Sequence, residues 1–476
     1  MANTGDKSTR AGEIGVFQVL ESKKGTKRFA DLSLGCVELS YYEDILSNSI
    51  SASAVIVESG LSNSDVGNSK GNNKGYMGIL DNLPVVGGEQ VNLVFRDNQT
   101  NPTTLKFLGS KSAQGNAFYV NRVRQVNPGT QRDIYYLDLC TREFIANEQV
   151  RVVKRYDGNI GENVVKILKG RLSGRNGLMS PKGVDFDKTS APYNFIGNDR
   201  KPFYVCTWLA SKSIPELTVN GKDTKGGAAG YFFFETYDGF KFKSVDKLNS
   251  PKSNPPKKSF IFTNTTELPK GYDAKILDVN VERDIDLQQN LTMGAYANRS
   301  FFFDYVNMKY KVRDYKLSDN TSKVKNVGKK SFGDNVAPEI KDSPSRILNK
   351  VLDIGTLPAG KTSSKQLEAW KKDPTKSNFD AADTMAQSAM RYNQLFSIKV
   401  NITIAGDFSL RAGDLIHCDF PDLTVDKSKE TNKQTGGKYL IASVCHRLTP
   451  EDCYTSLTLV RDSFGRKPIK MSGTSV

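Results

Sequence analysis

The sequence contains only two histidines, His417 and His446, and this scarcity limits the chemistry that the chain can perform. A Ser-His-Asp or Cys-His arrangement for nucleophilic catalysis would have to use one of them. The His-Glu-x-x-His helix is absent. The run Gly355 to Thr362 has the spacing Gly-x-x-x-x-Gly-Lys-Thr, and the run Gly67 to Gly71 has the spacing Gly-x-Ser-x-Gly. A short spacing of this kind identifies a site only in the matching fold. We expect no enzyme, and no catalytic, cofactor-binding or metal-binding residue. A carboxylate pair for glycoside hydrolysis stays open, because such a pair is defined by its spacing in the fold.

Paired cysteines are absent as well, since the six cysteines of the chain are scattered singly and none has the Cys-x-x-Cys spacing. This pattern excludes a zinc knuckle and gives no sign of a disulfide framework. We infer that the protein is assembled in a reducing compartment. The six positions are Cys36, Cys140, Cys206, Cys418, Cys445 and Cys453.

Each histidine lies beside a cysteine, so a metal site in this region is conceivable. It would use His417, Cys418, Cys445, His446 and Cys453. Neighbouring residues on a strand point to opposite faces, so at most one residue of each adjacent pair could bind the same ion. We interpret these residues as ordinary strand positions and predict no metal.

Long apolar runs are absent too, and none approaches the roughly 18 residues that a membrane-spanning helix needs. Residues 1–10 are polar and contain no apolar core, so we expect no secretory signal. Together with the unpaired cysteines, these features predict a soluble protein made inside the cell, without a membrane-spanning segment.

The charge is unbalanced, with 67 Lys and Arg residues against 52 Asp and Glu residues, a net +15. Such a surplus is typical of proteins that contact polyanions or acidic partners, but it also arises where lysines simply keep a β-rich protein soluble. The stretch 309–330 is especially basic and could touch DNA phosphates, or it could be a solvated strand face and loop. Its basic residues are Lys309, Lys311, Arg313, Lys316, Lys323, Lys325, Lys329 and Lys330.

One set of landmarks occurs twice in the chain, and it predicts a duplicated β-module. Each copy has the pattern of a turn, a strand, a loop, a long strand, a turn with proline and a last strand. The first copy contains Leu83, Gly88-Glu89, Val91-Asn92-Leu93, Tyr119, Val123, Val126-Asn127-Pro128 and Leu137-Asp138-Leu139. The second contains, in the same order, Phe408, Gly413-Asp414, Leu415-Ile416, Tyr439, Val444, Leu448-Thr449-Pro450 and Leu457-Thr458-Leu459.

The first half of the chain divides into three predicted parts. Residues 1–31 are expected to form a polar arm, and 32–144 a β-barrel domain in which Val91, Leu93 and Phe95 alternate onto one face. Residues 145–276 predict an α+β domain. It contains a short amphipathic helix that includes Val164 to Leu172 and a second helix that starts at Pro202. A hairpin runs from Gly230 to Lys243, with Asp238-Gly239 between its strands. The triplets 232–234 and 301–303 of phenylalanine could be core strands or interface anchors.

The second half is predicted to form one more barrel with an insertion. Residues 277–317 would supply its first part and 395–462 the remainder, with Ile398, Val400, Ile402 and Ile404 on one face of a long strand. Residues 318–394 would form an inserted lobe or loop and a helix near 380–392. Residues 463–476 would form a flexible tail.

The C-terminal part resembles the last barrel of the central baseplate hub protein of T-even-like contractile-tail phages, including marine and cyanophage types. In that family a helix precedes a strand that ends in Gly-Asn/Asp-Phe-x-Leu-x-x-Gly, and here the run Gly406 to Gly413 has this pattern. The resemblance is specific over about 70 residues. The chain departs from the family in its N-terminal arm, its longer loops and residues 318–376. Further similar segments are 393–398, 438–442, 444–448, 454–460, 41–46 and 51–55, together with the hairpin 233–242.

The resemblance implies a mainly β protein with α+β parts, built from two similar antiparallel barrels of the tail-tube type plus peripheral α+β domains. It also implies a homotrimer, in which three chains close into a ring of six similar barrels around a central channel. Such a ring would join the threefold central spike to the sixfold tail tube, contact wedge and other hub proteins, and let phage DNA pass without specific binding. The protein would then be a virion tail component assembled in the cytoplasm of a bacterial host. A cell-wall-degrading tail hydrolase and a nucleic-acid-binding protein that uses the basic surface are the alternatives.

Overall fold

The computed structural model describes most of the chain. The described residues are 11–21, 29–58, 83, 85–109, 116–127, 129, 132–170, 177–189, 193–216, 228–282, 287–304, 309–320, 324–331, 336–351, 381–421, 432 and 434–465. No helix in these ranges is long and apolar enough to cross a lipid bilayer.

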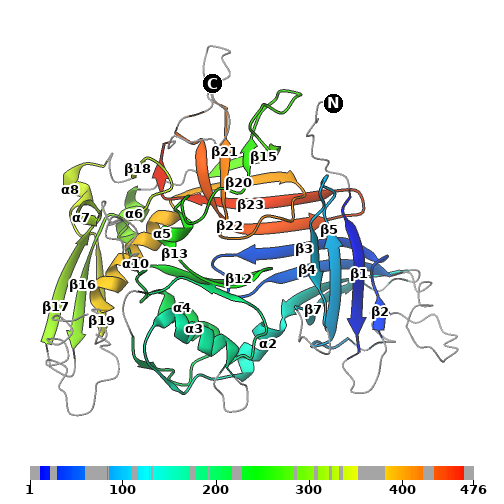
Figure 1. The fold of residues 1–476 in the computed structure, drawn as a ribbon, viewed down its shortest axis with the longest axis horizontal. Helices are drawn as coiled ribbons and strands as arrows, with labels where there is room; N and C mark the ends of the chain where they lie inside the picture. The colour runs from blue at the N-terminus through cyan, green and yellow to red at the C-terminus, as the bar shows by residue number, and fades with distance from the viewer. Residues whose placement is uncertain are drawn as a thin grey trace.

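A single 14-stranded sheet holds both halves of the chain together. Its first part, at the lower right of Figure 1, runs in the order β2-β1-β5-β7-β8-β4-β3, and β6 pairs with β5 on a side branch. These strands are β1 Glu13–Leu20, β2 Phe29–Asp31, β3 Cys36–Asp44, β4 Ser51–Glu58, β5 Gln90–Arg96, β6 Thr104–Phe107, β7 Phe118–Asn127 and β8 Asp133–Thr141.

The second part of the sheet, at the top of Figure 1, closes into a six-stranded barrel. The order is β22-β21-β14-β15-β20-β23, and β23 pairs again with β22. These strands are β14 Ser259–Ile261, β15 Ala274–Glu282, β20 Ile398–Ala405, β21 Leu415–Asp419, β22 Gly437–Leu448 and β23 Cys453–Arg461.

The predicted duplication is present in the strand order. The first copy runs β3-β4-β8-β7-β5 and the second runs β15-β20-β23-β22-β21, with every neighbouring pair antiparallel. The two copies differ at their margins, because β1 is antiparallel to β5 whereas β14 is parallel to β21. The expected fold class, mainly β with two similar sheet units and α+β parts, is confirmed.

Alternating side chains build the core of each copy, as period-2 burial requires. In β5 the inward residues Val91, Leu93 and Phe95 are fully buried. In β20 the inward residues from Ile398 to Ile404 are 0–2% exposed and belong to a separate core. Burial of such side chains stabilises each by roughly 1.5–3 kcal/mol relative to exposure.

The N-terminal residues depart from the predicted polar arm. Residues 13–20 form β1, which pairs along its length with β5, and it buries Phe17 and Val19. The register shifts between Ile14 and Val16. This bulge interrupts the alternation, which explains why the sequence pattern does not identify the strand.

Both helices predicted for the α+β segment are present, and α2, α3 and α4 lie at the bottom centre of Figure 1. Helix α3 begins after an Asn159 cap, and α4 begins at Pro202. The hairpin pairs Thr236 with Gly239, so Tyr237 and Asp238 form its turn and the glycine opens the second strand with φ +118°. The elements are α2 Arg142–Gln149, β9 Arg155–Tyr156, α3 Ile160–Lys169, β10 Val184–Phe186, β11 Phe195–Ile196, α4 Pro202–Ala210, β12 Tyr231–Thr236, β13 Gly239–Ser244 and α5 Val245–Leu248.

A separate three-stranded sheet, ordered β17-β16-β19, lies at the left of Figure 1 and packs against α10. Among the described residues of segment 277–317, only 277–282 of β15 join the second barrel, and the later strands belong to this sheet. Strand β14 and the start of β15 also belong to the barrel, although they fall within the predicted α+β residues 145–276. Residues 352–380 of the predicted insert, and 466–476 of the predicted tail, lie outside the described residues. The elements here are α6 Leu287–Met293, β16 Ala297–Asp304, β17 Lys309–Lys316, α7 Leu317–Asn320, β18 Lys330–Ser331, α8 Pro338–Lys341, β19 Arg346–Val351, α10 Ala381–Leu395 and β24 Ser463–Phe464.

Arg313 of the basic strand β17 does not lie on a solvent-exposed face of its sheet. Arg313 pairs across the ladder with Ser300, which is fully buried, and the next same-face residue of β16, Phe302, is 2% exposed. This face of the sheet is therefore the covered one. The side chains of Lys309 and Lys311 lie outside the described residues.

Candidate assembly interface

The two copies of the module match residue by residue at the glycine turn. The Gly88 N–H donates to the Val120 carbonyl at 2.7 Å, and the Val120 N–H donates to the Glu89 carbonyl at 2.9 Å. In the second copy Gly413, Asp414 and Ile441 make the same two bonds, each 2.9 Å long. Both glycines have a positive φ, +90° and +86°, which a side chain would strain.

The copies also share two β-bulges at matching places. The β3–β4 register shifts between Cys36 and Glu38, and the β15–β20 register shifts between Ile276 and Asp278. Likewise, the β7–β8 register shifts between Val120 and Arg122, and the β22–β23 register shifts between Ile441 and Ser443. Because bulges increase strand twist, the two sheets curve at the same points. Sequence landmarks reveal the repeat, but a single sequence gives no sign of the bulges.

The copies are joined edge to edge by a ladder between β3 and the C-terminal half of β22. Six residue pairs run from Ser443↔Asp44 to Leu448↔Leu39, and the Ile45 N–H extends the ladder by donating to the Ala442 carbonyl at 2.9 Å. The N-terminal half of β22 pairs instead with β21. One strand thus completes the closed barrel and binds the other sheet, and we call this contact the in-chain junction.

Aromatic side chains fill the core of the in-chain junction. His446 lies parallel to Tyr41 with ring centroids 5.9 Å apart, and Phe408 approaches the same imidazole at 4.6 Å. All three residues are fully buried. Burial, together with the positive charge of Arg411, lowers the pKa of His446 to about 3. The imidazole is therefore neutral at physiological pH and acts as a packing residue.

A buried carboxylate, Glu43, binds the junction to its surroundings. It accepts hydrogen bonds from the Tyr41 hydroxyl at 2.8 Å, the Tyr237 N–H at 2.8 Å and the Ala412 N–H at 2.9 Å. Burial raises its pKa, while the guanidinium of Arg411, 3.9 Å away, opposes the rise. These contacts connect β3 with the β12–β13 hairpin and the glycine turn of the second barrel.

The residues of the conceivable metal site do not come together. His417 Nε2 lies 2.9 Å from Asp419 Oδ2, whereas His446 Nδ1 lies 3.0 Å from the Thr455 hydroxyl. Among the described residues, no group of three or more His, Cys, Asp or Glu side chains could hold an ion. Both histidines are part of the packed strands.

Two buried ion clusters, which the sequence did not indicate, hold the domains together. Lys182 contacts Glu143 at 3.0 Å and also Glu235, so it links α2 to the β12–β13 hairpin. Arg391 of α10 contacts Asp462 at 2.6 Å and Asp246 at 3.1 Å. Burial raises the pKa of Asp246, and the charge of Arg391 opposes that rise. The partners are far apart in the chain, so spacing in the sequence cannot find them.

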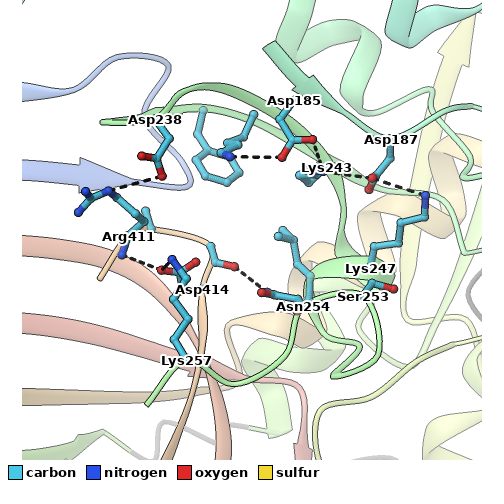
Figure 2. Close-up of a pocket in the computed structure, with 15 residues that line it drawn as sticks. Asp185, Asp187, Asp238, Lys243, Lys247, Ser253, Asn254, Lys257, Arg411 and Asp414 are labelled. Carbon is cyan, nitrogen blue, oxygen red and sulfur yellow. Dashed lines mark hydrogen bonds and ion pairs between the residues drawn. The ribbon is translucent and has the colours of Figure 1, made fainter. Parts of the chain in front are cut away.

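A cavity of about 290 Å³ opens where the hairpin meets the second barrel (Figure 2). Its cationic side chains lie beside carboxylates: Lys243 is 2.5 Å from Asp185, and Lys257 is 2.8 Å from Asp414. The residues that line it include neither histidine nor cysteine. The lining carries five Lys and Arg side chains against four carboxylates, so its excess of positive charge for a polyanion is only one.

No family model matches the sequence, and no curated protein sequence matches it. Solved structures do align over most of its length. The tail protein from Neisseria meningitidis MC58 aligns with a TM-score of 0.47 at 11% identity, over 94% of this chain and 96% of that chain. The 43 kDa tail protein of prophage MuSo2 from Shewanella oneidensis aligns with a TM-score of 0.47 at 9% identity, over 94% and 98%.

A further alignment is to the E. coli c3393 protein, described as a component of the type VI secretion system with structural similarity to the T4 bacteriophage tail proteins gp27 and gp5. Its TM-score is 0.37 at 9% identity, over 95% of this chain and 79% of that chain. At these scores and identities, the alignments alone carry no inference about function. These three solved structures are two tail proteins and one component of a type VI secretion system.

Proposed function

We propose that the chain is the structural hub of a phage tail baseplate, a homotrimeric ring that adapts a threefold central spike to a sixfold tail tube. The observation that carries this proposal is the duplicated five-strand unit, joined to its copy within one sheet. Three chains with two such units each present six similar units, so the ring has true threefold and approximate sixfold symmetry. Closed cyclic assemblies of this kind are a common solution for proteins with complementary edges.

The outer face of the joined sheet supports a channel wall. In β20 the residues between the buried positions are Lys399, Asn401 and Thr403, and the last two lie across from Thr458 and Ser456 of β23. This stretch of the face consists mostly of neutral hydroxyl and amide groups, which bind few phosphates and release few counterions. DNA would therefore slide past this stretch without being held.

In this role the protein acts through its contacts and performs no catalysis. Its partners are two further copies of itself, the central spike, the tail tube, and wedge or other hub proteins. Its location is the virion tail baseplate, after assembly in the bacterial cytoplasm.

Light scattering of the purified chain, combined with electron microscopy, tests the proposal. We expect a mass of three chains at micromolar concentration and a hollow ring with six similar lobes. A stable monomer without rings under these conditions would reject the homotrimeric hub.

A further inference from the structure

We propose that neighbouring chains in the ring are joined by the free edge of β15 from one chain and the free edge of β7 from the next, in the register of the in-chain junction. This inference rests on the trimer proposed above and names the surface and partner that build it. The partner is a second copy of this chain.

The repeat itself points to these two edges. Because β15 corresponds to β3 and β7 corresponds to β22, the counterpart of the β3–β22 ladder is a ladder between β15 and β7. Within one chain these two strands belong to different units and do not pair with each other. The counterpart ladder can therefore form only between two chains.

Both edges are open along the part of the required length that the structure describes. Strand β15 pairs with β14 only at Ala274 and Lys275, and no described strand pairs with that edge from Ile276 to Glu282. Strand β7 pairs with β5 only at Phe118 and Tyr119. Beyond the turn contact at Val120, the described part of the chain offers no ladder partner to that edge of β7. Such edges are templates for pairing with another chain.

The inward side chains of β15 are more exposed than their counterparts on β3, as expected for a strand whose partner is missing. In β3 the inward residues Leu39 and Tyr41 are fully buried, because β22 covers the strand beside them. Their counterparts in β15 are Val279, which is only partly buried, and Val281, which is 37% exposed. An apolar inward row that solvent reaches from one side is typical of a sheet that continues into a neighbour.

The ladders of each unit fix which residues would meet. Tyr42 pairs with Ser51 and Glu282 pairs with Lys399, at matching positions of β4 and β20. Cys445 pairs with Ser456 of β23, and Arg124 pairs with Tyr136 of β8. Cys445 and Arg124 therefore occupy matching positions of the two units. Since Tyr42 faces Cys445 in the in-chain junction, Glu282 would face Arg124 of the next chain.

The charges of the two edges are complementary. Strand β15 carries Asp278 and Glu282, whereas β7 carries Arg122 and Arg124. Arg124 already lies 2.9 Å from Asp138 of its own chain and is about one-third exposed, so it can bind a further carboxylate. Opposite charges on facing strands favour the paired register and select the correct edge.

A disulfide at this position tests the register. The Ile45 N–H bond to Ala442 places Tyr42 and Cys445 on a non-hydrogen-bonded pair, because the two pair types alternate along the ladder. At such pairs the Cα atoms are about 4.5 Å apart, which is close enough for a disulfide. The test variant is the double variant Arg124→Cys with Glu282→Cys, oxidised and run on a non-reducing gel. The matched positive control is Tyr42→Cys, which should form the same link to native Cys445 inside one chain.

We expect the double variant to shift to bands of two and three linked chains, while each single variant stays at the mass of one chain. Light scattering in the native state separates the two proposals. A trimer whose double variant does not cross-link, although the Tyr42→Cys control does, overturns the β15–β7 register and leaves the hub intact. A monomer overturns both.

Discussion

Tyr41 and His446 stack with their ring planes 5° apart, although 405 positions separate them in the chain (446 − 41). The contact joins β3 of the first sheet to β22 of the second, and both rings are fully buried. A substitution in either ring therefore probes the contact between the two units as well as the core of each.

Truncation of Tyr41 should destabilise the whole molecule. We expect Tyr41→Ala to lower the free energy of unfolding by about 3–5 kcal/mol, as for other large aromatic truncations. Tyr41→Phe keeps the ring and removes one donor to buried Glu43, so its cost should be about 1–3 kcal/mol. Urea unfolding of both variants measures the difference, and equal costs would contradict the importance of the stacked ring.

Acid should weaken the junction through His446. Its pKa is about 3 in the folded chain and about 6.5 in the unfolded chain, so below pH 6.5 the unfolded state binds a proton that the folded state does not. The stability due to the neutral imidazole is complete above pH 6.5 and falls by roughly 1.4 kcal/mol per pH unit as the pH drops toward 3. Unfolding measured between pH 6.5 and 4.5 should show a flatter pH dependence for His446→Phe than for the natural chain. Parallel curves would disprove the shift.

The glycines of the repeated turn make a matched pair of variants. At Gly88 a Cβ would meet no atom within 4 Å, so Gly88→Ala should cost only the strain of a positive φ, about 1–2 kcal/mol. At Gly413 a Cβ would lie 2.8 Å from Phe234 Cζ, so Gly413→Ala adds a clash. We expect the second variant to melt at the lower temperature in calorimetry. The reverse order would contradict the clash at Gly413.

Removal of Arg391 should leave two carboxylates buried without their cation. For Arg391→Ala we expect a loss of about 3–5 kcal/mol, because Asp246 and Asp462 are almost inaccessible. The control is Arg447→Ala, which breaks an exposed pair with Glu38 and should cost about 0–1 kcal/mol. If chemical denaturation gives similar values for both, the cluster does not stabilise the fold.

The sequence predicts strands well where alternation is uninterrupted. The inward residues of β5, β8 and β20 are buried as expected, because a two-residue period directly reports one covered face. Strand β1 is missed because its bulge shifts the pattern, and the face of β17 that carries Arg313 is covered by packing that composition does not describe.

The interface could be predicted only in part. The repeated glycine turn signals two similar units, but the pairing of β3 with β22 depends on long-range backbone contacts between units. The Lys182 and Arg391 clusters are equally hidden, since each joins three segments and no short motif records them.

Because β22 is shared between the barrel and the neighbouring sheet, the two units cannot rotate independently about a flexible hinge. Any bending between them would have to break the backbone hydrogen bonds between β3 and β22, including that of Ile45, or distort the barrel wall. A mechanical load applied to one unit would then pass through this ladder into the other, so a ring built from such chains would resist shear as a stiff collar.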